Sequence, residues 1–383
     1  MSGPLERLLR DAAYRCEVFP VSRDRTFLAH AAVAPLPRPV VEAVTGYLER
    51  AAREGQFDML CPGLADDTRR LAADLLHVDA DEIALSPSTS ASLSTIAGAL
   101  RWQRGDRVLV LADDFPSLPL PWTNLREQGV EVALLPYRDT PLGTDEVLGA
   151  VDDRTRLVVL STAHFVTGRP VADLPGLGRA LRERSVLLAV DAIQTLGAFP
   201  LDARDVDFLA ADGHKWLLAP AGMGVLYVRR ALLDRLRVPA LGWHSLRDPK
   251  RYTADGPLAE GARRFEPGSL NVLGLLGLRA ALTLLAEVGS AAVADRLRIL
   301  RRTLVAGLTE RGFHVPGAGV PEWSGITAFR PTDVDADVLA GRLLAAGVVT
   351  SVRRMPGTGI AHVRLAPHYY TTDEDLERLW ATL

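Results

Sequence analysis

From about residue 80 to residue 230 the chain alternates short apolar, β-rich runs with amphipathic stretches of helical period. Continuous apolar strands separated by helices are typical of a mostly parallel sheet covered by helices on both faces. We therefore predict an α/β fold with a mostly parallel seven-stranded sheet, and we expect ligands at the carboxyl ends of its strands. The predicted strands are 83–86, 107–111, 130–135, 156–161, 186–190, 206–210 and 223–228, and the predicted helices are 90–100, 118–128 and 174–183.

The part of the chain after this region has a different pattern. Residues 241–268 are rich in glycine, proline and charge and are predicted to be a loop, whereas 272–312 has a long helical period. Strand-like runs at 325–329 and 362–365 then predict a smaller α+β domain. The expected division is an N-terminal segment, 1–25, that packs with the small domain, a large domain, 26–260, and the small domain, 261–383.

Composition argues against several classes of function. Lys and Arg together number 44 and Asp and Glu together number 47, which gives a net charge of −3. This net charge gives no indication of binding to nucleic acid or to an anionic membrane. No apolar run reaches the roughly 20 residues that span a bilayer, and no secretory signal pattern precedes the first helix. Cys16 and Cys61 form neither a disulfide framework nor a metal-binding pattern. We expect a cytoplasmic protein without a metal, a nucleic-acid partner or a membrane anchor.

A strand-end acid and a downstream lysine are the most specific chemical feature. One predicted strand leads into Asp191, and Lys215 follows 24 positions later on a predicted loop. This pair suits pyridoxal phosphate, because a lysine forms a Schiff base with the cofactor aldehyde while a carboxylate keeps the pyridine nitrogen protonated. Gln194 lies one helical turn after Asp191 and is expected to reach the phenolic oxygen. The alternatives are that Asp191 caps a helix and that Lys215 is a surface residue.

Further segments contain candidate contacts to such a cofactor. Ser88 and Thr89 lie between a predicted strand and helix, where hydroxyls and free N–H groups bind phosphate but also serve as ordinary helix caps. Phe115 follows the next strand and is either a ring-stacking residue or a buried loop aromatic. His214 is a candidate phosphate or substrate contact, and Asp212 is expected to approach a phosphate only if a cation compensates its charge.

Candidate substrate contacts lie in other segments. Arg364 alternates with apolar residues on a predicted strand, so it either points inward to clamp an α-carboxylate or lies on the surface. Arg353 and Arg354 are alternative clamps. His164 follows a strand end and His30 lies in an apolar N-terminal run, and each either borders the substrate or is a polar loop histidine.

Taken in order, these segments resemble the class V aminotransferase family of pyridoxal phosphate enzymes. Its members include cysteine desulfurases, selenocysteine lyases, isopenicillin N epimerase-like proteins and kynureninases. The resemblance covers the chain from about Phe27 to the C-terminus. The matching motifs are Val190-Asp191-Ala192-Ile193-Gln194, Gly213-His214-Lys215-Trp216, Arg264-Phe265-Glu266-Pro267-Gly268-Ser269-Leu270-Asn271, and His30-Ala31-Ala32 before Pro35.

The resemblance implies a fold-type I homodimer that binds pyridoxal 5′-phosphate, acts on a small amino acid and shares its active site between subunits. It implies that Lys215 is the Schiff-base lysine, Asp191 the pyridinium partner and Gln194 the O3′ partner. The remaining implied roles are ring stacking for Phe115, phosphate binding for Ser88, Thr89 and His214, phosphate binding in the neighbouring subunit for Ser269, and substrate-carboxylate binding for Arg364.

Two departures narrow the expected reaction. Family cysteine desulfurases carry a nucleophilic cysteine shortly before the carboxylate-binding arginine, but residues 350–360 contain none, and Asp212 replaces a small hydroxyl residue. We therefore favour a lyase that cleaves C–S or another β-bond without a cysteine nucleophile, with Lys215 removing the Cα proton after the substrate amine displaces it. Transamination and epimerisation are alternatives within the family. A nucleotide or sugar-phosphate enzyme and a non-catalytic binding protein are alternatives outside it.

Overall fold

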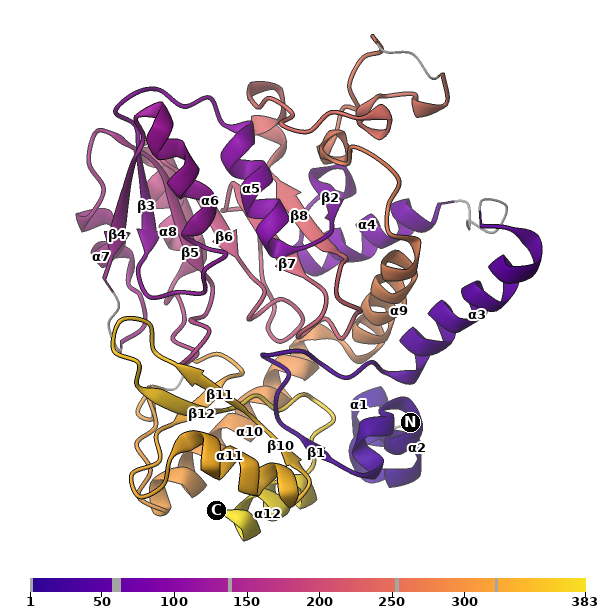
Figure 1. Cartoon of the computed structure of the whole chain (residues 1–383), viewed down its shortest axis with the longest axis vertical. Coiled ribbons are helices and arrows are strands. Elements are labelled where there is room, and N and C mark those ends of the chain that lie inside the picture. The colour runs from indigo at the N-terminus through magenta and orange to yellow at the C-terminus, as the bar shows by residue number, and fades with distance from the viewer. Residues whose placement is uncertain (1–2, 57–62, 137–139, 252–254, 321–322) are drawn as a thin grey trace.

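The structure is a computed structural model of the chain, and it describes all residues except 1–2, 57–62, 137–139, 252–254 and 321–322. Figure 1 shows a central sheet with helices against both faces in one half of the molecule and a smaller sheet with its own helices in the other half. Both ends of the chain lie in the smaller half (Figure 1).

The central sheet confirms the predicted α/β fold. Its strands are β2 (Ile83–Ser86), β3 (Arg107–Leu111), β4 (Glu131–Leu135), β5 (Thr155–Ser161), β6 (Leu187–Asp191), β7 (Phe208–Asp212) and β8 (Gly224–Val228). They form a 7-stranded sheet in the order β2-β8-β7-β6-β5-β3-β4. β8 is antiparallel to both of its neighbours, and all other neighbouring strands are parallel. Loops that leave the parallel strands therefore meet at one edge of the sheet, where a ligand is expected.

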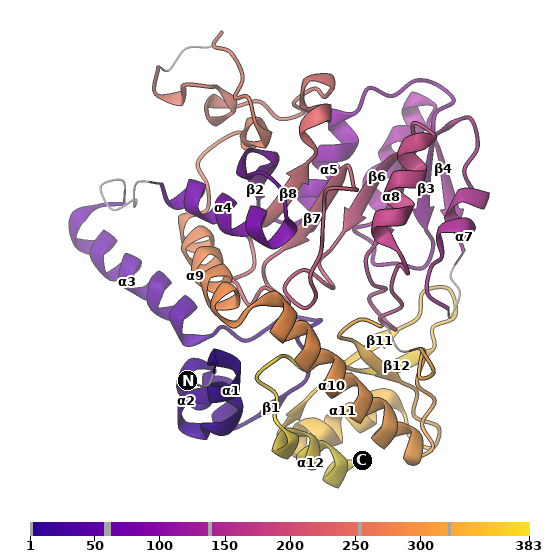
Figure 2. The same cartoon turned by 180° about the vertical axis from the view of Figure 1, so that it is seen from behind.

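Helices bury both faces of this sheet, which explains why its strands are apolar along their whole length. α5 (Thr89–Ala99) and α6 (Leu120–Thr123) lie on one face, and α4 (Leu64–Leu76) and α8 (Leu174–Glu183) lie on the other (Figures 1 and 2). The short α7 (Thr144–Gly149) packs on α8. α3 (Arg38–Glu54) projects from the sheet and contacts α9 (Val272–Val288).

Two predicted helices are shorter in the structure. The helix predicted over 118–128 is the four-residue α6 followed by a 3-10 turn over 124–128. Pro119 is its N-cap and Pro121 lies in its first turn, the part of a helix where the missing N–H of proline breaks no α-helical hydrogen bond, so the prolines mark the start of the helix. The helix predicted over 272–312 is two helices, α9 and α10 (Ser290–Glu310), that meet at 78°. Gly289 between them has a φ of +87°, a left-handed conformation that glycine adopts without strain.

The smaller half is built on a three-stranded antiparallel sheet in the order β11-β12-β9. Its strands are β9 (Thr327–Phe329), β11 (Ser351–Arg354) and β12 (Ala361–Leu365), with α10, α11 (Ala336–Ala345) and α12 (Asp373–Thr382) beside them. The N-terminal helices α1 (Pro4–Arg10) and α2 (Ala12–Val18) lead into β1 (Thr26–Phe27), which pairs with β10 (Val348–Val349). Phe19 also stacks on Tyr370, with ring centroids 3.9 Å apart. α9 belongs to the predicted small domain but packs on α3 and α4, which belong to the predicted large domain. The exact domain boundaries therefore stay a prediction.

Among the described residues, no single helix has the length and apolar composition needed to cross a membrane. α9 and α10 meet those criteria only when taken together, across their bend.

Candidate active site

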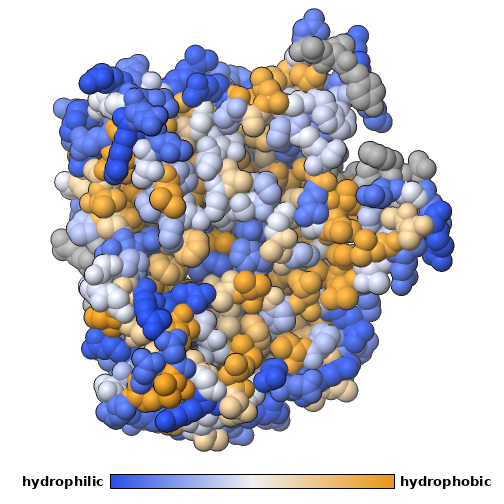
Figure 3. Space-filling model, viewed as in Figure 1, coloured by the Kyte–Doolittle hydropathy of each residue, from blue (hydrophilic) through white to orange (hydrophobic). Residues whose placement is uncertain are grey.

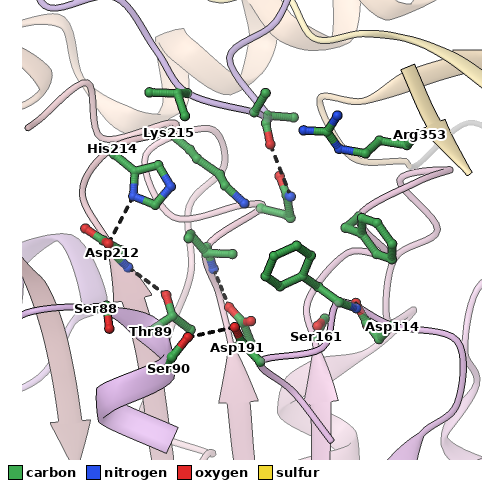
Figure 4. Close-up of a pocket in the computed structure, with 18 of the residues that line it drawn as sticks. Ser88, Thr89, Ser90, Asp114, Ser161, Asp191, Asp212, His214, Lys215 and Arg353 are labelled. Carbon is green, nitrogen blue, oxygen red and sulfur yellow. Dashed lines mark hydrogen bonds and ion pairs between the residues drawn. The ribbon is translucent and has the colours of Figure 1, made fainter. Parts of the chain in front are cut away.

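A pocket of about 330 Å³ opens where the carboxyl ends of the parallel strands face the small sheet. Its volume matches that of sites for small organic ligands. Figure 4 shows hydroxyl residues at one end, Arg353 at the other and the side chain of Lys215 pointing into the space between them. The lining residues are Ala31, Ala32, Val33, Ser88, Thr89, Ser90, Asp114, Phe115, Ser117, Ser161, Phe165, Asp191, Ile193, Gln194, Asp212, His214, Lys215, Arg353 and Arg364.

Lys215 lies on the loop that leaves β7, and its ammonium group faces the pocket (Figure 4). The chain has two lysines, Lys215 and Lys250, and Lys250 is exposed on a distant loop. Burial lowers the pKa of Lys215, the nearby Asp191 carboxylate acts in the opposite direction, and the charges of two pocket arginines lower the pKa further. A buried amine of this kind gives up its proton more readily than a surface lysine.

Asp191 ends β6 and supplies a buried carboxyl group to the floor of the pocket. Burial raises its pKa, whereas the N–H of Ile193, which donates to Oδ1 at 2.9 Å, and the charge of Lys215 lower it. A cationic ligand beside a buried carboxyl group stabilises its ionised form, so Asp191 is suited to bind such a ligand.

Gln194 is held against the pocket wall by both ends of its amide. Its Nε2 donates to the carbonyl of Ala31 at 3.3 Å, and its Oε1 accepts from the indole N–H of Trp216 at 3.4 Å. The sequence placed Gln194 near Asp191, and the structure shows that both line the same cavity.

The hydroxyl end of the pocket is formed by the start of α5 and the loop after β7. Ser88 caps α5 by accepting from the N–H of Ala91 at 3.1 Å, and Thr89 accepts from the N–H of Asp212 at 3.0 Å. Ser90 Oγ lies 2.7 Å from Ser117 Oγ. The N-terminus of a helix attracts anions, so this end of the pocket suits a phosphate.

His214 and Asp212 lie together beside the hydroxyl residues (Figure 4). Nδ1 of His214 is 3.0 Å from Oδ2 of Asp212, at ion-pair distance but outside hydrogen-bonding geometry. The other oxygen of Asp212 accepts from the N–H of Gly213 at 2.7 Å. His214 therefore lies where a group that compensates the charge of Asp212 was expected, and it can do so only in its protonated form.

Arg364 is fully buried on β12 and points into the opposite end of the pocket. Its Nε donates to Ser351 Oγ at 3.1 Å and its Nη1 donates to the carbonyl of Phe165. Its Nη2 has no hydrogen-bond partner in the described part of the chain. Burial, and secondarily the charge of Arg353, lower its pKa to about 9, so the guanidinium is charged at neutral pH and offers a donor to an anion.

The structure places four predicted site residues outside the lining of this pocket. His30 is buried with its ring nitrogens near the carbonyl of Ala366, at 2.9 Å, and the hydroxyl of Tyr370, at 2.8 Å, and its expected contact with the substrate stays a prediction. Arg354 points away and pairs with Asp337 at 2.5 Å. His164 lies behind the pocket wall, with Nε2 2.7 Å from the carbonyl of Asp113, and burial lowers its pKa to about 4. Ser269 lines a separate cavity beside α3.

The lining residues that sequence reasoning missed or left secondary include Asp114, Ser161, Phe165 and Arg353. Ser161 ends β5, and Asp114 and Phe165 follow β3 and β5, so their positions after strand ends were a usable signal. Arg353 and Arg354 are adjacent on β11, and only the orientation of that strand shows which of them faces the pocket.

The second matching motif, around Glu266, is structural and lies away from the pocket lining. Arg264 donates to the carbonyls of Ala259 and Leu233, at 2.8 and 3.0 Å. Glu266 is buried and accepts from Arg69 at 2.6 Å and from the N–H of Leu85 at 2.8 Å. Because Leu85 belongs to β2, this contact fixes the strand that leads to the hydroxyl end of the pocket.

Comparison with known proteins agrees with this architecture. The family model "Aminotransferase class-V" matches residues 26–379. The uncharacterized aminotransferase YcbU of Bacillus subtilis is 29% identical over 94% of each chain. A probable cysteine desulfurase of Methanothermobacter thermautotrophicus is 29% identical over 95% of each chain, and the isopenicillin N epimerase of Streptomyces clavuligerus is 29% identical over 90% of each chain.

Solved structures have the same fold. A mutant of C-DES with glycine covalently linked to its PLP cofactor superposes with a TM-score of 0.88 at 23% identity, covering 96% of this chain and 98% of that one. The cysteine desulfurase CsdA of Escherichia coli superposes with a TM-score of 0.83 at 25% identity, covering 97% of this chain and 96% of that one.

Proposed function

The chain belongs to the class V aminotransferase family, and from that premise we propose that it is an amino-acid lyase in which Lys215 holds the cofactor and moves the Cα proton. The observation that carries this proposal is the placement of Lys215. It is the one pocket-lining lysine of a chain that has two, and it faces the buried carboxyl of Asp191.

The family cofactor is pyridoxal phosphate, and the residues of the pocket fit it. When bound, this cofactor supplies an aldehyde that condenses with amines and a protonated ring that takes up electrons. The pocket offers one buried amine, Lys215, and three buried acids, Asp114, Asp191 and Asp212. Burial raises the pKa of Asp191, and a cationic ring beside it would favour its ionised form. Phe115 lines the same pocket with 47% of its surface exposed, which leaves an aromatic face free for a flat ring.

Each end of the pocket has residues suited to hold one part of the cofactor. Ser88, Thr89 and His214 would hold the phosphate with the N-terminus of α5, and the Asp212 carboxylate lies 3.0 Å from Nδ1 of His214. Asp191 would hold the ring nitrogen. Gln194 and Phe115 would contact the oxygen and the face of the ring. These side chains come from the ends of different strands, which explains why they are far apart in sequence.

Lys215 is suited to proton transfer because burial lowers the pKa of its amine. An amine with such a pKa is available as a base near neutral pH and can return the proton as an acid. Arg364 would orient the substrate by binding its α-carboxylate through Nη2, which is otherwise unpartnered in the described chain. The carboxylate end and the amine end of the substrate are then both fixed before the proton moves.

The absence of a cysteine between residues 350 and 360 supports elimination over transfer of sulfur to a cysteine. Cys16 lies on α2 and does not line the pocket, and Cys61 falls outside the described residues. Transamination and epimerisation start from the same Cα proton removal. Relatives named aminotransferase and epimerase keep these two reactions as alternatives to the lyase.

We also propose a homodimer that completes the site. Large apolar side chains are exposed along α3 and the segments around it, namely Val33, Leu36, Val41, Leu48, Leu241, Trp243 and Leu273. Figure 3 shows hydrophobic surface gathered on the side of the molecule where α3 and α9 lie. Ser269 lines a cavity with Tyr47 of α3 and with Trp243, so it lies next to this apolar surface rather than in its own pocket. An interface there would bring Ser269 toward the pocket of the second copy.

Lysine variants test the proposed role directly. The wild-type protein, Lys215→Ala and the matched Lys250→Ala are loaded with pyridoxal phosphate, reduced with borohydride to fix a lysine-bound cofactor, and mapped by mass spectrometry. We expect the modified peptide to contain Lys215 in the wild type and in Lys250→Ala, and to be absent in Lys215→Ala. A cofactor fixed at Lys250, or a Lys215→Ala protein that still becomes modified, would refute the assignment.

The reaction type is tested with a panel of amino acids. A lyase releases ammonia and a 2-oxo acid without any amino acceptor, and the eliminated group appears in equal amount. A transaminase forms the 2-oxo acid only with a second 2-oxo acid that takes the amino group, and an epimerase returns the enantiomer. Product formation that depends strictly on an acceptor would overturn the lyase proposal while leaving the role of Lys215 intact.

A further inference from the structure

Two arginines reach the pocket from one face of the small sheet. Arg353 lies on β11 and Arg364 on β12, and both line the pocket. Ser351 is paired with Arg364 across the two strands, and side chains two residues apart on a strand share a face, so Ser351, Arg353 and Arg364 point the same way. Arg354 points to the opposite face, where it pairs with Asp337 of α11.

The two guanidinium groups differ in how completely the protein satisfies them. Arg364 is fully buried and anchored through Nε and Nη1, which leaves Nη2 for one anion. Arg353 is partly buried, and its one hydrogen bond among the described residues runs to the carbonyl of Val352 at 2.8 Å. No ion pair joins Arg353 to an acid in the described part of the chain, whereas the adjacent Arg354 pairs with Asp337. Figure 4 shows its guanidinium directed into the pocket.

The charges at this end of the pocket leave one guanidinium without a partner. Arg353 and Arg364 are close enough that each positive charge acts on Lys215, and the charge of Arg353 lowers the pKa of Arg364. An α-carboxylate neutralises one of the two guanidinium groups. The second would then be covered by the bound substrate and lose water without gaining a counter-charge, which is costly.

We infer that Arg353 binds an acidic group on the substrate side chain, so that the substrate is an amino acid whose side chain carries a negative charge. This inference rests on the proposed function, because it takes the α-carboxylate to be bound by Arg364. Arg353 has the planar fork of donors that binds such groups in a bidentate manner. Because Arg353 is only partly buried, water can reach its guanidinium until the substrate arrives.

The inference is tested by pairs of ligands that differ only in the acid. The cofactor-loaded enzyme is titrated with aspartate and asparagine, and with glutamate and glutamine, while the cofactor absorbance is followed to half-saturation. We expect the acid of at least one pair to bind about tenfold or more tighter than its amide, the fold-change of a charge-assisted hydrogen bond. Cysteine sulfinate in the same assay shows whether sulfinate or carboxylate is preferred.

Variants of the adjacent Arg353 and Arg354 distinguish the loss of a contact inside the pocket from a general effect of removing an arginine from this strand. Arg353→Met should remove the preference for the acid while leaving amide binding unchanged, and Arg353→Lys should retain part of it. Arg354→Met is the matched control and should keep the full preference, because Arg354 faces α11. An equal loss of acid and amide binding in Arg353→Met would overturn the inference, since both arginines would then hold the α-carboxylate. A wild-type enzyme without any preference would overturn it as well.

A second readout does not depend on the cofactor reaction. Calorimetry with succinate and succinamate, which lack the amine, should show tighter binding of succinate to the wild type and to Arg354→Met but not to Arg353→Met. If the protein fails to bind pyridoxal phosphate at Lys215, the proposed function fails, and succinate binding still reports on Arg353. Equal binding of succinate and succinamate to the wild type contradicts the inference by itself.

Discussion

Replacing Glu266 with glutamine tests whether the buried ion pair behind the pocket holds β2 in place. The Glu266 side chain is 0% exposed and that of Arg69 is 7% exposed. Oε2 accepts from Nη2 of Arg69 at 2.6 Å, and Oε1 accepts from the N–H of Leu85 at 2.8 Å. β2 is an edge strand, so Leu85 has no strand neighbour on that side and its N–H depends on Glu266. Glu266→Gln keeps the shape but removes the charge.

The expected loss follows from the burial of the partner. Removing one member of a buried ion pair costs about 3–5 kcal/mol, because the other charge stays buried. Asp66 also contacts Arg69, at 2.6 Å, but it is 73% exposed and compensates little, which places the loss near the lower end. An unfolding entropy of about 2.1 cal/mol/K per residue gives about 0.8 kcal/mol/K for 383 residues. The predicted fall in melting temperature is therefore about 4 °C.

Differential scanning calorimetry of the cofactor-free protein measures this fall. Asp66→Asn is the matched control, because it removes the exposed partner of the same arginine, and we expect a shift below about 1 °C. Glu266→Gln should also weaken cofactor binding, since β2 leads to Ser88 and Thr89. Equal shifts in the two variants would refute the reasoning, because the buried carboxylate would then contribute no more than the exposed one.

Two further predictions concern the pocket and the apolar surface. Burial raises the pKa of Asp114 from 3.8 to about 6, so this group stabilises the fold below pH 3.8 by about 3 kcal/mol, and the contribution is lost as the pH rises to 6. The free energy of unfolding of Asp114→Asn should therefore rise relative to that of the wild type between pH 4 and 6, as measured by denaturant titrations of both proteins at each pH. A difference between the two proteins that stays constant with pH would contradict this. Leu48→Asp on α3 should weaken the dimer about a hundredfold or more in sedimentation measurements, whereas Leu134→Asp, an equally exposed site on β4, should not. A wild-type protein that sediments as a monomer would remove the basis for this prediction.

The sheet could be predicted from sequence because each strand is apolar over its whole length and each helix between strands is amphipathic. The predicted strand over 107–111 agrees with β3, and the predicted helix over 174–183 agrees with α8. The errors fall where single residues break the pattern. Pro119 and Pro121 mark the start of one helix at Leu120, and Gly289 lies at the bend of another that the apolar period alone could not divide.

The part of the pocket at the strand ends was also accessible to sequence reasoning. Asp191, Gln194 and Lys215 follow strands that share an edge, so their position in sequence determined their position in space. His30 shows the limit of that reasoning. The structure buries it among aromatic rings, including those of His368 and Tyr370, whose proximity no local pattern reveals.

The sequence by itself determined the fold class and the placement of Lys215 and Asp191 at one edge of the sheet, because these depend on local periodicity and on the ends of strands. Tertiary structure alone decided which residues of the small sheet line the pocket. Arg353 and Arg354 are adjacent and chemically identical, and the alternation of side chains on β11 sends one into the pocket and the other to Asp337. The direction of that alternation is fixed by the pairing of β11 with β12 and by the packing of the small sheet on α11, contacts that the sequence does not specify locally.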